Sequence, residues 1–166
     1  MEERFRDDLK TLVYEAESEL LEIRDISDGS IVLNDRTLEL PQPRTFGDLD
    51  GVQTFVNKVH GYAPVTRAWT PPGPPPKVAP RSIDEHTHYK RRYNVIAVPL
   101  DMSTISPVDE LDILHEMAHF FNRESDDQRH GTNFIQCYAH LLGTVLHPTW
   151  KHLFVHALDQ RGVSLS

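Results

Sequence analysis

Apolar residues recur every three or four positions over several long stretches of the chain, a spacing that predicts amphipathic helices. These stretches cover residues 5–21, 52–59, 107–121, 131–145 and 149–158. Gly61 is the expected stop of the second helix, and Pro148 is expected to break the fourth. Ser106-Pro107-Val108-Asp109 supplies start signals for the third helix: Ser as N-cap, Pro at the first helical position and Asp at the third.

Shorter apolar or alternating runs lie between these helices and predict strands. They cover residues 31–33, 37–40, 64–69, 86–92 and 93–100, and Asn34-Asp35 is expected to form a hairpin turn between the first two. The run 93–100 is apolar on both faces, which indicates a covered strand. Residues 71–76, five of them proline, predict a stiff extended loop that serves as a connector or as a rim over a cleft. The whole pattern favours a single α+β domain over residues 1–166, with helices at both ends around a small sheet.

Composition and charge narrow the class of protein. A hydrophobic fraction of 39% and a charged fraction of 25% are typical of globular proteins. The net charge of −8 is concentrated in residues 1–50, with 14 acidic and 6 basic residues, whereas residues 51–166 hold 11 of each. This acidity argues against a nucleic-acid partner. The lone Cys137, the charged N-terminus and the lack of a long apolar run favour a cytoplasmic protein without disulfide, signal peptide or membrane span.

The strongest chemical signal is the run His115-Glu116-Met117-Ala118-His119, an H-E-x-x-H pattern inside a predicted helix. Residues four apart lie one turn apart on the same helix face, so both imidazoles can reach one metal ion. Glu116 lies beside the first histidine, from where it can deprotonate a water molecule that zinc has acidified. A pair of core histidines, satisfied by the backbone or by Asp112, is the alternative interpretation.

A catalytic zinc site requires a third protein ligand and one open position. No glutamate follows Glu124, and positions 122 and 125 hold Asn and Ser, so two large classes of H-E-x-x-H enzyme do not fit. His130 is the favoured third ligand, because a short polar loop can return it to the helix face and Gly131 allows a tight entry into the next helix. The alternatives that stay open are His140, His147, Asp126 and Asp127.

These residues carry a resemblance to a known family. His115–His119, ten further residues and then His130-Gly131-Thr132-Asn133-Phe134 resemble the SprT-like zinc peptidase pattern, H-E-x-x-H followed by H-G-x-x-F. Residues 6–19, 48–59 and 93–99 also look like segments of a family of small metallohydrolases from actinobacteria and their phages. The match therefore spans most of the chain and is strongest over residues 111–146. If the protein is phage-encoded, its expected location is the cytoplasm of the host cell.

The resemblance implies a zincin-type fold, the ligand set His115, His119 and His130 for one zinc ion per chain, and Glu116 as general base. It implies no particular substrate. The chain departs from SprT-like proteases that act near nucleic acids, because it has no cysteine-based zinc ribbon and no basic tail.

We therefore predict a metallopeptidase acting on a peptide or protein substrate, in which Glu116 takes the proton of water and passes it to the leaving nitrogen. The strand over 93–100 is expected to form the cleft wall, where an extended peptide adds as a further strand. Three alternatives stay open: a hydrolase of other amides or esters, a zinc-stabilised binding or regulatory protein without turnover, and a nucleic-acid-associated protease.

A few further residues allow two interpretations each. His86 and His88 form an exposed polar strand face or a second metal site. Lys90-Arg91-Arg92 is a solvated strand end or a site for an acidic substrate segment. Asp112 is a surface acid or a carboxylate that orients a ligand. The candidate oxyanion stabilisers are Tyr89, Tyr93 and Tyr138, among which the sequence does not choose.

Overall fold

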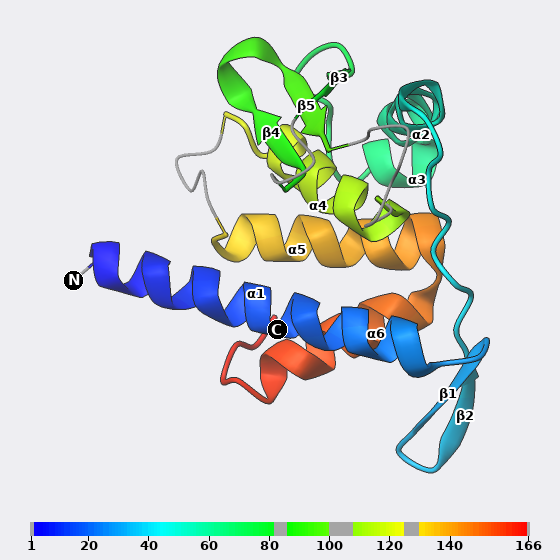
Figure 1. The fold of residues 1–166 in the computed structure, drawn as a ribbon. Coiled ribbons are helices and arrows are strands. Elements are labelled where there is room, and N and C mark those ends of the chain that lie inside the picture. Colours follow the sequence, from blue (N-terminus) through cyan, green and yellow to red (C-terminus); the bar gives the residue numbers. More distant parts are fainter. Residues whose placement is uncertain (1, 82–85, 100–107, 125–129, 166) are drawn as a thin grey trace. The chain divides into compact units, whose positions relative to one another are not determined.

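The computed structural model describes residues 2–81, 86–99, 108–124 and 130–165, with the backbone alone for residues 2–8. This part of the chain combines helices with two small sheets, as expected for an α+β protein (Figure 1). It divides into two compact units, the first made of residues 1–42 and 127–166 and the second of residues 43–126. None of the described helices is long and apolar enough to cross a membrane.

Helices dominate the first unit. They are α1 (Glu2–Ile26), α5 (Thr132–Leu141), which continues as a π-helical turn over Leu142–Leu146, and α6 (Pro148–Asp159). The expected helices are thus confirmed, with α1 longer than its apolar pattern and Pro148 opening α6 as well as ending the preceding turn. Their apolar faces form a core that includes Val13, Ala16, Leu20, Phe134, Tyr138, Leu141, Trp150, Phe154 and Ala157.

A two-stranded antiparallel hairpin completes this unit, formed by β1 (Ser30–Leu33) and β2 (Arg36–Glu39). Asn34 and Asp35 both adopt positive φ, 50° and 63°, which confirms the predicted turn and explains why two small polar residues stand there. The chain after the hairpin is tied to α6, since the Trp150 indole Nε1 donates to the Pro41 carbonyl at 2.8 Å.

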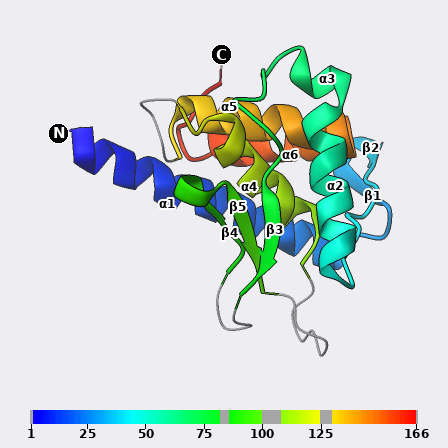
Figure 2. The same cartoon turned by 90° about the horizontal axis from the view of Figure 1, so that it is seen from above.

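The second unit is built on a three-stranded sheet with strand order β3-β5-β4 (Figure 2). The strands are β3 (Lys77–Pro80), β4 (His88–Lys90) and β5 (Val95–Val98), and β5 pairs in parallel with β3 and antiparallel with β4. The helices of this unit are α2 (Leu49–Gly61), α3 (Ala63–Thr66), the 3-10 turn η1 (Arg91–Tyr93) and α4 (Glu110–Phe121).

Three strand predictions need correction. The strand expected over 64–69 is wrong: the chain forms the short helix α3, because Pro64 stands in its first turn and Val65 is buried from there. The strands expected over 86–92 and 93–100 exist but are shorter. The turn η1 and Asn94, at φ 51°, reverse the chain between them, and residue 100 lies outside the described part.

The position of β5 overturns one functional expectation. A peptide was expected to add to the strand over 93–100, but β5 is the central strand and is hydrogen-bonded on both sides. A central strand has no unpaired edge, so no further strand can add to it.

The proline-rich loop over 71–76 forms neither helix nor strand, but it bends at residues 72–74 instead of staying extended as expected. Side chains from α2, from just after α4 and from just before β5 contact its carbonyl groups. Asn94 Nδ2 donates to Pro74 O at 3.1 Å, Arg123 Nη2 to Pro72 O at 3.0 Å and Gln53 Nε2 to Pro76 O at 3.0 Å. His60 Nε2 lies 2.8 Å from Gly73 O. Proline has no N–H, so this loop satisfies its carbonyls through side chains rather than through a ladder.

Helix α4 is fixed at both ends. It does not begin with Ser106 as N-cap and Pro107 in its first turn; these two residues lie outside the described part. Asp109 is the N-cap, with extended backbone and a side chain that accepts from Asp112 N, while the Asp112 carboxylate accepts from Asp109 N. Asp112 is therefore a capping residue rather than a plain surface acid. At the other end, Asn122 Nδ2 donates to Ala118 O at 2.8 Å.

Replacing Asp109 by Ala should lower the free energy of unfolding by about 1 kcal/mol, the usual cost of losing an N-cap acceptor. Asp109→Asn keeps an acceptor oxygen and should cost only a fraction of that. Urea denaturation followed by far-UV circular dichroism measures both. Equal losses in the two variants would contradict a capping role for this side chain.

Candidate metal centre

Helix α4 presents the H-E-x-x-H residues on one side of its axis. His115 and His119 are half-buried, and their ring centroids lie 5.0 Å apart, as expected for residues one turn apart. Glu116 follows His115 by about 100° around the helix and lies about 60° from His119. All three side chains thus lie within one face of a helix whose ends are capped.

Glu116 is held by the sheet of the same unit. Its carboxylate is buried, with 6% of the residue exposed, and Oε2 accepts the backbone N–H of Tyr89 at 2.7 Å. This partner is a backbone group in the middle of β4, so the strand helps to fix the position of the carboxylate. A buried carboxylate needs such a donor, because burial without one is costly.

His130 stands immediately before α5, whose N-cap is Gly131. It is buried, with 6% exposed, and its ring lies between two aromatic rings of its own unit. The ring centroids of Tyr14 on α1 and Phe134 on α5 lie 4.9 and 4.8 Å from that of His130. These contacts limit the orientations that the imidazole can adopt.

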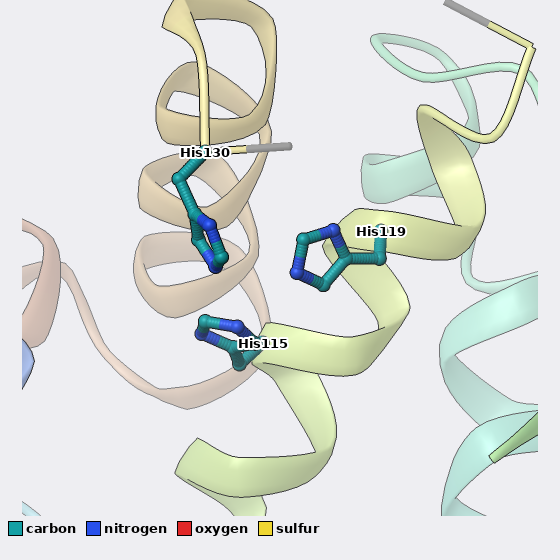
Figure 3. Close-up of side chains that lie close together, drawn as sticks. All are labelled: His115, His119 and His130. Carbon is teal, nitrogen blue, oxygen red and sulfur yellow. The ribbon is translucent and has the colours of Figure 1, made fainter. Parts of the chain in front are cut away.

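The ligand atoms of His115, His119 and His130 all lie within 4.8 Å of one another, close enough to bind one metal ion. Figure 3 shows the three rings pointing toward a common point. Three imidazole nitrogens are donors that suit zinc and other divalent transition metals, so the side chains fit such an ion.

The other candidate ligands serve different contacts or lie outside the described part of the chain. His140 Nε2 lies 3.4 Å from Thr144 Oγ1, one turn further along the chain. His147 is the N-cap of α6, with Nδ1 accepting from Thr149 N at 3.2 Å. Asp126 and Asp127 lie outside the described residues. His86 precedes β4 whereas His88 lies within it, so the two do not share a strand face as expected.

Strand β4 shapes the electrostatics around Glu116. Burial raises the pKa of the Tyr89 phenol, and a hydrogen bond and positive charge from Arg123 oppose that rise. The Tyr89 hydroxyl donates to Asn94 Oδ1 at 2.9 Å. Burial, followed by the positive charges of Arg81 and Lys90, lowers the pKa of His88. Positive charge therefore gathers along this strand.

The structure also identifies contacts that the sequence pattern missed. The Tyr89 N–H is a backbone group, and no residue pattern marks it. Tyr14 lies within the first predicted helix and was given no role, yet its half-exposed ring packs on His130. Among the suggested oxyanion stabilisers, Tyr138 is buried between Phe134 and Phe154, and Tyr93 is 66% exposed in η1.

Comparison of the chain with protein-family models, with curated proteins and with solved structures found no significant match. The interpretation of this site therefore depends on its own residues and geometry.

Single substitutions should separate the ligands from the other histidines. We expect His115→Ala, His119→Ala and His130→Ala each to weaken zinc binding by more than the ~10–100-fold typical of a supporting residue. His140→Ala and His147→Ala, the matched controls, should keep the wild-type affinity. Metal content by mass spectrometry and competition with a chromogenic chelator measure this. Full zinc binding by the His130 variant would remove that residue from the site.

The imidazole of His88 should titrate below its ordinary value of 6.5, since burial and the neighbouring cations disfavour its protonated form. The imidazole of His88 therefore binds a proton more readily in the unfolded chain than in the folded protein. The contribution of His88 to stability is thus complete above pH 6.5 and is lost as the pH falls toward the lowered pKa. Lys90→Gln should raise the NMR titration midpoint and Lys58→Gln should not. A midpoint at or above the ordinary value would contradict this.

Proposed function

We propose that this protein is a zinc-dependent hydrolase, a metallopeptidase with a zincin-like fold, in which His115, His119 and His130 hold the metal and Glu116 is the general base. The observation that carries the proposal is the cluster of three imidazoles within 4.8 Å, two of them on the helix that also bears Glu116.

The donor set favours a catalytic rather than a structural site. Structural zinc sites are usually closed by four protein ligands and are often rich in cysteine. The cluster contains three residues in the described part of the chain, and none of them is cysteine. When bound there, zinc supplies a Lewis acid that acidifies water and polarises a carbonyl oxygen.

Glu116 then acts as the proton carrier. Its carboxylate takes a proton from the attacking water as the new carbon–oxygen bond forms, and delivers that proton to the amide nitrogen as the carbon–nitrogen bond breaks. The hydrogen bond from Tyr89 N–H to Oε2 fixes one oxygen of the carboxylate and so limits its rotation. A base held in this way loses less entropy when it reaches the transition state.

Peptides are the proposed substrates because the resemblance to SprT-like peptidases points to them. The same residues would serve other amides and esters, so a substrate panel should include both. A zinc-stabilised binding protein is the alternative from a different class, and it would leave the buried Glu116 without a chemical role.

Replacing Glu116 by Gln should keep the bound zinc and lower kcat/KM by at least about 10²-fold, because the amide cannot accept the proton. The matched control is Glu124→Gln, the same change at an exposed position just after α4, which should keep full activity. Internally quenched peptide libraries with zinc-loaded protein provide the assay, and zinc content is measured in parallel.

Wild-type turnover in the Glu116 variant would remove Glu116 from the mechanism. Zinc bound at one per chain, with no cleavage of any peptide, amide or ester by the wild-type protein, would favour the binding-protein alternative.

A further inference from the structure

Positive charge is concentrated in one stretch of an otherwise acidic chain. Residues 51–100 contain seven basic and two acidic residues, whereas the whole chain carries a net charge of −8. The two acids, Asp84 and Glu85, lie outside the described residues. This stretch contributes α2, α3, η1 and all three strands of the second unit's sheet.

One face of the sheet packs on the helices, and on the other face the edge strands carry exposed side chains on either side of the buried Ala97 of β5. Tyr89, Ile96 and Val78 are cross-strand neighbours and lie on the face that packs on the helices, where Tyr89 contacts the Phe120 ring of α4 at 6.1 Å between centroids. Side chains alternate along a strand, so the next positions lie on the opposite face. There Lys77 and Lys90 both pair with Val95, and His88 pairs with Ala97.

The cationic sheet face consists of Lys77, His88 and Lys90 with the adjoining Arg91 and Arg92 of η1, all of them exposed. Lys77, Lys90, Arg91 and Arg92 form no ion pair with any residue that the structure describes. Arg92 lies over the exposed ring of Tyr93, with its guanidinium carbon 5.6 Å from the ring centroid. Burial, and after it the positive charges of Arg81 and Lys90, lower the pKa of His88, which agrees with cations gathered on this face.

The cationic sheet face adjoins the candidate base through strand β4. His88 and Lys90 flank Tyr89, and the Tyr89 N–H is the donor that holds Glu116 Oε2. Helix α4 packs on the opposite face of the sheet, so a substrate segment bound along these side chains reaches the general base around the outer edge of β4.

We propose that the cationic sheet face binds an acidic segment of the peptide substrate and so makes the enzyme selective for Asp- and Glu-rich sequences. This rests on the proposed function and adds the substrate class. Lys77 and Lys90 are separated by two strand spacings, about 9–10 Å, and side chains on one face of an extended peptide recur every ~7 Å. Such a peptide can offer a carboxylate to each lysine. The net charge of −8 opposes a long nucleic acid, whose phosphates extend beyond the cationic sheet face.

The test measures binding separately from turnover. Fluorescence anisotropy follows labelled peptides of alternating Glu and Ala, or of alternating Gln and Ala, on zinc-loaded full-length Glu116→Gln protein. The variant Lys77→Glu/Lys90→Glu reverses two charges of the cationic sheet face. The matched control Lys58→Glu/Arg67→Glu changes the net charge equally at two exposed positions on α2 and just after α3. Thermal melting confirms that each variant is folded.

We expect the acidic peptide to bind at least about tenfold more tightly than its Gln counterpart, with binding that weakens as salt is raised. Lys77→Glu/Lys90→Glu should weaken the binding of the acidic peptide about tenfold, and the control variant should change that binding far less. Equal binding of the two peptides, or equal effects of the two variants, would overturn the proposal. So would tighter binding of a single-stranded oligonucleotide of equal charge that also depends on Lys77 and Lys90.

The result distinguishes this inference from the proposed function. Cleavage of neutral peptides by the wild-type protein, without preference for acidic ones, would retain the peptidase and reject the role of the cationic sheet face. Specific binding of the acidic peptide, with no cleavage of any substrate by the wild-type protein, would retain the binding surface and reject the hydrolase.

Discussion

The hydrogen bond from the Tyr89 backbone to the Glu116 carboxylate is the interaction on which the candidate site depends. It joins the middle of β4 to the helix that also carries His115 and His119, and it does so in a buried place where an unpaired carboxylate would be costly. The capping box at Asp109 and the Asn122 cap fix the ends of that helix. The strand and the helix ends together set the direction in which the three site residues of α4 point.

In the same unit, side chains also form the hydrogen bonds that the proline-rich loop cannot form through its own backbone. Residues 71–76 can form almost no backbone ladder, and Gln53, His60, Asn94 and Arg123 contact their carbonyls instead. Arg123 lies just after the end of α4 and also interacts with the Tyr89 phenol. Arg123 thus links the proline-rich loop, the end of α4 and strand β4. A change in the loop is therefore expected to shift groups close to Glu116.

The charge close to the candidate site has the opposite sign to the net charge of the chain. The acidic excess lies in residues 1–50, whereas the cationic sheet face stands on the strand that contacts Glu116. A local field of opposite sign near a site, within a protein of net negative charge, favours short acidic ligands over long polyanions. The acidic excess and the cationic sheet face therefore belong to different parts of the chain.

The long helices, the Asn34-Asp35 turn and the pairing of His115 with His119 could be predicted from the sequence, because these depend on local spacing and local conformational preference. It could not determine that residues 64–66 are helical, that β5 is the central strand or that Asp112 caps α4, since burial and pairing with distant residues decide these. The choice of His130 over His140 and His147 was favoured by sequence, but its proximity to the other two imidazoles is a property of tertiary structure. The hydrogen bond that Glu116 accepts from Tyr89 comes from a backbone N–H, which every residue except proline possesses, so only the fold could identify it.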